Sequence, residues 1–233
     1  MILKKRLFAF IGARSGSKGL VDKNIKMFHG KPLMAWTIEA ALNSQYIDKV
    51  FVSTDSKKYA EIAKQYGAEV IDRPEHLSND DSSLAEALQH AYEQIKTLHG
   101  EFNIALNLQA TSPLRTCKHI DEAIELYTLR DNEELRLFSC YQLEQKYAWI
   151  MKGDKQGYAH FVDNSEQIKT HHARQKNAAI YMPNGAIYIL PTNDLSKFYN
   201  DTSIPYVMNQ AESIDIDTIQ DFELAEQAFL SIH

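Results

Sequence analysis

LFAFIGARSGSKGL, residues Leu7 to Leu20, joins an apolar run to a glycine-rich loop that carries the cations Arg14 and Lys18. A short, continuous apolar run is typical of a buried strand. A strand that leads into exposed backbone N–H groups and flexible cations can surround a polyphosphate. The loop matches neither common phosphate motif, because Ser17 stands where a P-loop requires glycine and no glycine lies two residues from Gly16. A surface turn with solvated charges is the alternative interpretation.

Strand and helix patterns alternate outward from this stretch. Pro32 suits the start of a helix, Asp55 is expected to cap the next helix, and Gly67 is expected to end it. The expected strands cover residues 7–11, 50–54, 68–71, 103–108, 135–141, 185–190 and 213–216, and further helices are expected at 82–99, 121–129 and 218–230. This alternation predicts an α/β fold with a mainly parallel central sheet flanked by helices, and ligands at the carboxyl ends of the strands.

The chain of 233 residues is expected to form a single domain, 1–233, with one inserted segment. Residues 142–181 are polar, rich in His, Lys and Gln, and too long for an ordinary loop. We therefore expect them to form a small dimerisation arm or cap.

The composition narrows the class of protein. With 44% hydrophobic and 24% charged residues, the chain can bury a sizeable core. Its formal charge of -6 speaks against general binding of nucleic acid, so an anionic ligand would need a local cluster of cations. Cys117 and Cys140 form no CxxC pair and suggest a reducing cytoplasm. The apolar run after Arg6 is too short for a signal peptide or a membrane span, so we expect a cytoplasmic protein.

Polar residues gather where other predicted strands end. Arg73 follows the third strand, and LQATSPLR, residues 108–115, follows the fourth and holds Gln109 and Arg115. Because carboxyl ends of parallel strands meet at one edge, these side chains are expected beside the glycine loop. A surface cation that flanks a helix is the alternative for Arg115.

SIDIDT, Ser213 to Thr218, predicts a metal site. In an extended strand the side chains alternate, so Asp215 and Asp217 would share one face. Two carboxylates suit Mg²⁺, which binds oxygen ligands and bridges to substrate phosphates. The alternative is a solvent face in which Asp217 or Thr218 caps the last helix.

These motifs together resemble the acylneuraminate cytidylyltransferases, the CMP-sialic acid synthetases. ARSGSKGLVDKNI, VSTDS, RP, LQATSPLR, PNGAIYI and SIDIDT occur here in the order and approximate spacing of that family, from about residue 7 to 226. The resemblance implies a Rossmann-like nucleotidyltransferase fold and a homodimer whose arm reaches the partner. It also implies transfer of CMP from CTP to a nonulosonic acid, with release of pyrophosphate.

The resemblance also implies roles for single residues. Arg14, Lys18, Lys23, Asn24, Arg73 and Ser83 would bind the nucleotide; Gln109, Arg174, Asn184 and Tyr188 would bind the sugar acid; Asp215 and Asp217 would hold Mg²⁺, for which Mn²⁺ could substitute. Arg14, Lys23 and Asp217 are the expected catalytic residues. The sugar hydroxyl would attack the α-phosphorus while Mg²⁺ and the cations stabilise the growing charge. The proton acceptor would be Asp217, or a hydroxide or metal-bound oxygen near it.

Departures from the family pattern keep the acceptor open. Ala110 stands where the family often has proline, Met182 stands where it has a cation before PNGAIY, and Lys146 does not fall at the step of the family's basic residue in the arm. N-acetylneuraminate is the first candidate, and because of these departures legionaminate is the second. A nucleotidyltransferase that acts on 3-deoxy-octulosonate or a sugar 1-phosphate is a third interpretation, and a non-catalytic nucleotide-binding protein is a fourth.

Overall fold

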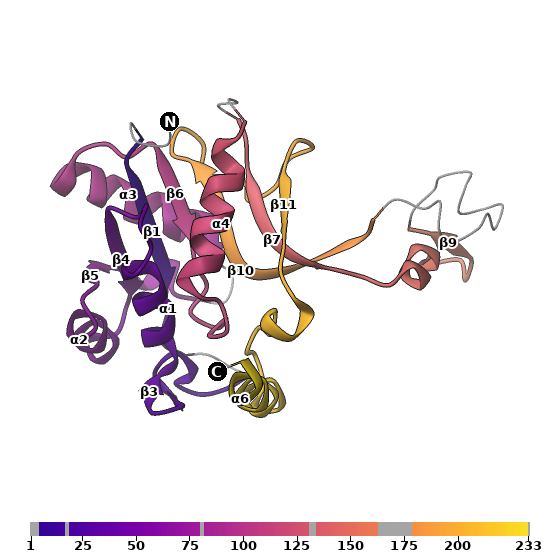
Figure 1. Cartoon of the computed structure of the whole chain (residues 1–233), viewed down its shortest axis with the longest axis horizontal. Helices are drawn as coiled ribbons and strands as arrows, with labels where there is room; N and C mark the ends of the chain where they lie inside the picture. The colour runs from indigo at the N-terminus through magenta and orange to yellow at the C-terminus, as the bar shows by residue number, and fades with distance from the viewer. Residues whose placement is uncertain (1–4, 17–18, 80–81, 131–133, 163–178, 233) are drawn as a thin grey trace.

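A seven-stranded sheet runs through the centre of the computed structural model, in the order β11-β7-β10-β6-β1-β4-β5 (Figure 1). The structure describes residues 5–16, 19–79, 82–130, 134–162 and 179–232. The strands of this sheet are β1 (Leu7–Gly12), β4 (Lys49–Thr54), β5 (Glu69–Asp72), β6 (Ile104–Asn107), β7 (Leu137–Gln142), β10 (Tyr181–Pro191) and β11 (Ile204–Val207). All neighbouring pairs are parallel except the two that involve β10. The amino end of β10 therefore lies at the edge where the other strands have their carboxyl ends.

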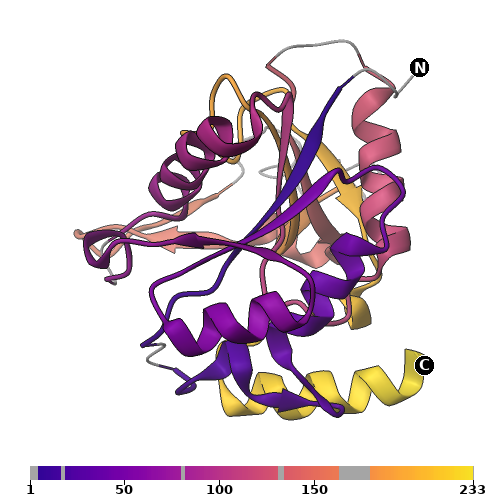
Figure 2. The same ribbon diagram turned by 90° about the vertical axis from the view of Figure 1, so that its left-hand side faces the viewer.

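Alternate side chains of β1 divide the core into two layers. Leu7, Ala9 and Ile11 belong to the cluster beneath three helices, whereas Phe8 and Phe10 pack on the opposite face. The first face carries α1 (Leu33–Leu42), α2 (Lys57–Gln65) and α4 (Cys117–Thr128), and the second carries α3 (Leu84–His99). Figure 2 shows α3 and α4 on opposite sides of the sheet. The predicted α/β fold with a mainly parallel sheet is confirmed.

A third apolar cluster docks the helix α6 (Ile219–Ile232) against the hairpin of β2 (Met27–Phe28) and β3 (Lys31–Pro32). The ring of Phe28 meets those of Phe222 and Phe229 edge-on, with centroids 5.6 and 5.5 Å apart. Ile216, just before α6, is fully buried in the same cluster. Packing of α6 therefore fixes the segment that carries Asp217.

The segment between β7 and β10 extends away from the sheet as an arm (Figure 1). Its described part contains a 3-10 turn at Gln145–Trp149 and a two-stranded sheet of β8 (Met151–Gly153) and β9 (Ala159–Phe161). Because β7 ends and β10 begins at the same edge of the sheet, the arm leaves the body at the edge where ligands are expected.

The expected strand at residues 213–216 is wrong. This segment follows a 3-10 turn at Gln210–Glu212 and has no ladder partner; the backbone N–H of Ile216 donates instead to the Thr111 carbonyl, 2.9 Å away. Its isoleucines do point inward, because they pack on α6. The strand that completes the sheet is β11, which was not expected because Pro205 argues against a strand. Proline is tolerated there because β11 is an edge strand.

Two helix starts also differ from expectation. Ser56, not Asp55, caps α2, by accepting a hydrogen bond from the Tyr59 backbone N–H. The helix expected from residue 121 begins at Cys117, because Thr116 and His119 form a capping box. In the part of the chain that the structure describes, no helix has the length and apolarity needed to cross a membrane.

Candidate active site

A pocket of about 520 Å³ opens where the loops after β1, β5 and β6 meet the starts of α3 and α6. Its charged lining, among the described residues, consists of three cations, Arg14, Lys23 and Arg73, and the carboxylate of Asp217. The full lining is Gly12, Arg14, Gly19, Lys23, Asn24, Arg73, Ser82, Ser83, Leu84, Gln109, Ala110, Thr111, Asp217 and Thr218. The pocket is therefore locally cationic in a chain of negative net charge, which suits an anionic ligand.

The glycine loop is held from both sides. Ser15 donates its backbone N–H to Asp55 Oδ1 (2.7 Å) and its hydroxyl to Asp55 Oδ2 (2.5 Å), and the Asp55 carboxylate stands at the end of β4. Burial alone would raise the pKa of Asp55, but the Ser15 hydrogen bonds and the charge of Arg73 bring it below the ordinary value. Arg14 Nη1 donates to the Asn79 carbonyl (2.6 Å), and Asn24 Nδ2 donates to the Arg14 carbonyl (3.2 Å).

Lys23 connects the first loop to the segment before α6. Its Nζ donates to Asp217 Oδ1 (2.7 Å) and to the Ile216 carbonyl (3.0 Å). Gly19 lies against the same segment, because a Cβ at this position would come within 2.5 Å of the Asp217 carbonyl oxygen. Only glycine lets the loop approach Asp217 so closely.

Arg73 is a buried cation with spare hydrogen-bonding capacity. Its Nε donates to Ser53 Oγ (3.1 Å), whereas its buried Nη2 has no partner among the described residues. Burial lowers the pKa of Arg73 to about 10, against the charge of Asp55, which raises it. Arg73 is therefore charged at neutral pH and lines the pocket, where its positive charge favours an anionic ligand.

Gln109 sits at the junction of the pocket and β10. Its carbonyl accepts hydrogen bonds from Thr37 Oγ1 and from Nη1 of the buried Arg115, both at 3.2 Å. The side chain crosses Gly185, whose φ of +75° and missing side chain leave room; a Cβ there would lie 2.8 Å from Gln109 Oε1. Burial lowers the pKa of Arg115 to about 9, and its Nη1 also donates to the Ala186 carbonyl (3.0 Å).

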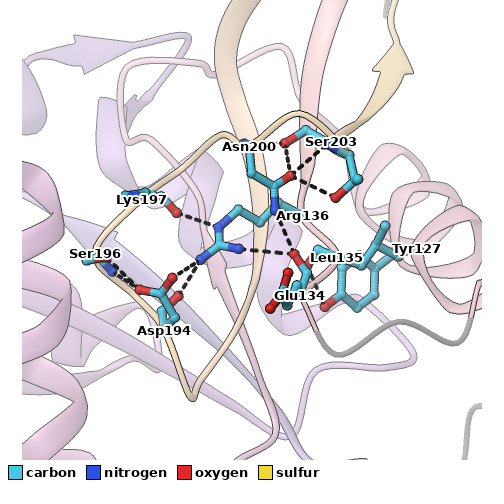
Figure 3. A network of polar contacts seen from close by, with 10 residues as sticks. Tyr127, Glu134, Leu135, Arg136, Asp194, Ser196, Lys197, Asn200 and Ser203 are labelled. Atoms are coloured by element: carbon cyan, nitrogen blue, oxygen red, sulfur yellow. Dashed lines mark hydrogen bonds and ion pairs between the residues drawn. The ribbon is translucent and has the colours of Figure 1, made fainter.

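Tyr188 faces a loop that is fixed by a buried guanidinium. The Tyr188 and Tyr199 hydroxyls are 3.0 Å apart, and burial together with this contact raises the pKa of Tyr188. Figure 3 shows how Arg136 fixes the loop that carries Tyr199: it donates to the carbonyls of Lys197 (2.8 Å) and Asp194 (3.1 Å) and to the Asp194 carboxylate (2.5 Å). Asn200, in the same view, donates to the Glu134 carbonyl.

The donor set at Asp215 and Asp217 fits a divalent cation that also binds substrate. Burial raises the pKa of Asp215, although a hydrogen bond with the Thr111 side chain opposes this, and Asp215 Oδ1 is buried with no partner among the described residues. The Asp217 side chain is 72% exposed and faces the pocket. Among the described residues no group of three or more His, Cys, Asp or Glu could hold a metal alone. Carboxylates that act together with substrate phosphates are the usual Mg²⁺ arrangement.

Comparison with known protein families identifies the family to which this chain belongs. A family model described as cytidylyltransferase matches residues 8–229. The chain belongs to the cytidylyltransferase family. It is 37% identical over 226 residues to an N-acylneuraminate cytidylyltransferase of Escherichia coli O18:K1:H7, and the aligned region covers 96% of this chain and 52% of that protein. It is 34% identical over 227 residues to a CMP-N,N'-diacetyllegionaminic acid synthase of Legionella pneumophila, and here the aligned region covers 95% of each protein. The chain therefore spans about half the length of the first relative and nearly all of the second.

Solved structures agree on the fold of this cytidylyltransferase family member. A CMP:2-keto-3-deoxy-manno-octonic acid synthetase complexed with CTP superposes with a TM-score of 0.72 at 16% identity, covering 98% of this chain and 100% of that one. A 4-diphosphocytidyl-2C-methyl-D-erythritol synthase of Anaerococcus prevotii gives 0.67 at 15% identity, covering 97% and 99%. At these identities the likeness concerns the fold.

The expected site residues of this family member fall into three groups. Arg14, Lys23, Asn24, Arg73, Ser83, Gln109 and Asp217 line the one pocket. Asn184, Tyr188 and Asp215 are not part of its lining, although Asp215 interacts with the lining residue Thr111. Lys18 and Arg174 lie outside the described residues, so their roles stay predictions.

Two residues that shape the site did not emerge as candidates from the sequence. Asp55 was expected to cap a helix but instead binds Ser15. Gly19 was only one of several glycines in the loop, but it is the one that lies against Asp217. The position of Asp55 directly after an expected strand was the available signal for the first. No sequence signal separates Gly19 from Gly16.

Proposed function

We propose that this chain transfers CMP from CTP to the anomeric hydroxyl of a sialic-type nonulosonic acid and releases pyrophosphate. The observation that carries the proposal is the cationic pocket, in which Arg14, Lys23 and Arg73 surround a space next to a pair of carboxylates. The identity with N-acylneuraminate cytidylyltransferases supports the acceptor class.

In this proposal the pocket residues act by binding and by electrostatics. Arg14 and Lys23 hold the triphosphate, Arg73 adds a third positive charge to the nucleotide side, and Asn24 and Ser83 complete that side. Ser83 already accepts from the Glu86 N–H as the cap of α3, so it would contact the nucleotide from the amino end of a helix.

Asp215 and Asp217 would hold a divalent cation, Mg²⁺ or Mn²⁺ in its place, which when bound neutralises charge on the phosphates. Gln109 and Tyr188 orient the sugar acid, and Arg174 would bind its carboxylate. Asp217 accepts the proton of the attacking hydroxyl, because its exposed carboxylate faces the pocket.

The acceptor is the open part of the proposal. N-acetylneuraminate is the first candidate, and a legionaminate is the second because the Legionella relative matches over nearly its whole length. The test is incubation with CTP and Mg²⁺ and a panel of nonulosonic acids, followed by mass identification of the CMP-sugar. Formation of one CMP-nonulosonate supports the proposal. Pyrophosphate release with 3-deoxy-octulosonate or a sugar 1-phosphate alone, or with no acceptor, contradicts it.

We further propose that the chain is a homodimer whose arm places Arg174 near a sugar site, in its own or the neighbouring subunit. A two-stranded sheet such as β8–β9 is marginally stable alone, so an additional surface is expected to cover it. Both cysteines are free, which suits action in the cytoplasm.

A further inference from the structure

Asn184 is expected at the sugar site, yet its side chain is fully engaged within the protein. Oδ1 accepts hydrogen bonds from Ser139 Oγ (2.5 Å) and from the Ala186 backbone N–H (3.1 Å). Nδ2 donates to Ser213 Oγ (2.8 Å) and contacts Met208 Sδ at 3.4 Å. A primary amide offers two acceptor and two donor directions, so no direction is left for a ligand. The residue is 5% exposed.

The orientation of this amide is fixed by its neighbours. The Ala186 backbone N–H can only donate, so the atom 3.1 Å away must be the amide oxygen. The two serine hydroxyls extend these contacts into one chain of hydrogen bonds. Ser139 Oγ accepts from the Ile187 N–H (2.7 Å), and Ser213 Oγ donates to the Asn209 carbonyl (2.8 Å). Linked, buried hydrogen bonds of this kind hold their members rigidly.

Ser213, a member of this hydrogen-bond chain, lies two residues before Asp215. Residues 213–217 have no strand partner, so a few polar contacts and the packing of their isoleucines set their path. On the amino side of Asp215, Ser213 accepts from Asn184 and its backbone N–H donates to the Gln210 carbonyl (3.2 Å). On the carboxyl side, the Ile216 N–H donates to the Thr111 carbonyl and the Ile216 carbonyl accepts from Lys23. Asp215 Oδ1 is buried without a partner among the described residues, and an unpaired buried oxygen stays in place only if its surroundings hold it there.

We propose that Asn184 is a positioning residue, which acts through Ser213 to hold the Asp215 carboxylate at the edge of the pocket, and that it makes no contact with the acceptor. The role of Asp215 in this statement rests on the proposed function. The link between Asn184 and the 209–217 segment does not, and it can be measured without any turnover.

The experiment compares Asn184→Ala, Ser213→Ala and the double variant with wild type. Thr192→Val is the matched control, because it removes a half-buried hydroxyl that donates to the Phe102 carbonyl (2.6 Å) away from Asp215. Hydrogen exchange followed by mass spectrometry reads the peptide that covers residues 209–217. We expect about 10-fold faster exchange there in both single variants and no change in the control.

Kinetics give the second readout. We expect kcat to fall about 10-fold in each single variant with KM for the acceptor within about twofold of wild type, and the double variant to be no worse than Asn184→Ala. Unchanged exchange at 209–217 overturns the proposal, and so does a KM for the acceptor raised 10-fold or more at constant kcat. If no acceptor is turned over, the proposed function fails while the exchange result still decides the role of Asn184. If Asn184→Ala does not fold, Ser213→Ala carries the test.

Discussion

Lys23 joins two parts of the site that come from opposite ends of the chain. Its ammonium group pairs with Asp217 and also holds the Ile216 carbonyl. In Lys23→Ala we therefore expect a higher KM for CTP and a kcat lowered by about 10- to 100-fold, because charge-assisted contacts to the triphosphate are lost. The affinity for the sugar acid should change little. Initial rates measured against both substrates check this.

Lys49→Ala is the matched control for Lys23. Lys49 also pairs with a carboxylate, Glu69, at 2.6 Å, but on the surface at the start of β4. Its variant should keep both KM values. A CTP dependence that is unchanged in Lys23→Ala would reject the phosphate-binding role.

Asp217 and Thr218 separate a metal role from a capping role. Thr218 and Asp221 cap α6, since Asp221 Oδ2 accepts from the Thr218 N–H (2.8 Å) and Thr218 Oγ1 accepts from the Asp221 N–H (3.2 Å). We expect Asp217→Asn to change the stability by no more than about 0.5 kcal/mol while turnover falls about 100-fold or more. Excess Mg²⁺ or Mn²⁺ should restore part of the lost turnover.

Thr218→Ala should show the opposite pattern, with a loss of about 1 kcal/mol of stability and an unaltered metal dependence. Melting curves and metal titrations of both variants decide between the roles. A fully active Asp217→Asn enzyme would mean that the carboxylate pair is structural.

Single residues of the pocket could be predicted to different degrees. Arg14, Arg73 and Gln109 were recognisable because each stands within three residues of the end of an expected strand, and the parallel sheet brings such positions together. Asn184 could be placed near the site but not given its role, because that role depends on partners 45 and 29 residues away in the sequence, Ser139 and Ser213.

At the scale of elements, the loop after β10 depends on the ion pair of Arg136 with Asp194 (Figure 3). Hydrogen bonds from Ser196, together with Arg136, hold the pKa of Asp194 below its ordinary value. A lowered pKa in the folded state adds stability above the unfolded pKa of about 3.9, and this stability is lost as the pH falls toward the folded pKa.

We therefore expect wild type to be more stable than Asp194→Asn at pH 7, by about 1 kcal/mol or less because the carboxylate is half exposed. The gap should shrink below about pH 4. Denaturant unfolding of both proteins between pH 7 and pH 3 measures it, and Asp201→Asn in the same loop should match wild type at pH 7. A gap that grows on acidification would contradict the assignment.

Elements with strong apolar runs were predictable, and elements defined by distant partners were not. β1 is buried on both faces and its sequence is continuously apolar, and β4 has the buried apolar run Val50 to Val52 at its centre. The alternation in residues 213–216 looks like a strand, yet Ile216 is buried and Ile214 partly buried in the cluster around α6, and no neighbouring strand offers hydrogen bonds. The same periodicity thus arises from two kinds of packing, and only the tertiary structure distinguishes them.

At the scale of the whole molecule, the arm exposes apolar surface far from the sheet (Figure 1). Ile150 is 46% exposed, Met151 48% and Val162 62%. The Val162 backbone N–H donates to the Ile150 carbonyl (2.9 Å), so these residues lie together. Adjacent exposed apolar side chains of this kind are typical of an interaction surface.

If a second copy covers this surface, a charge placed there should separate the subunits. We expect wild type to be a dimer by light scattering and Ile150→Glu to associate about 100-fold more weakly, because burying an unpaired carboxylate costs several kcal/mol. Leu98→Glu is the matched control, since Leu98 is 69% exposed near the end of α3 on the body of the molecule. If Arg174 then serves the neighbouring subunit, the Ile150→Glu monomer should lose affinity for the sugar acid and keep its KM for CTP, because the described lining of the nucleotide pocket includes no residue of the arm. Equal loss for both substrates would point to misfolding, which the melting temperature reveals, whereas a wild-type monomer of full activity would remove the arm from the mechanism.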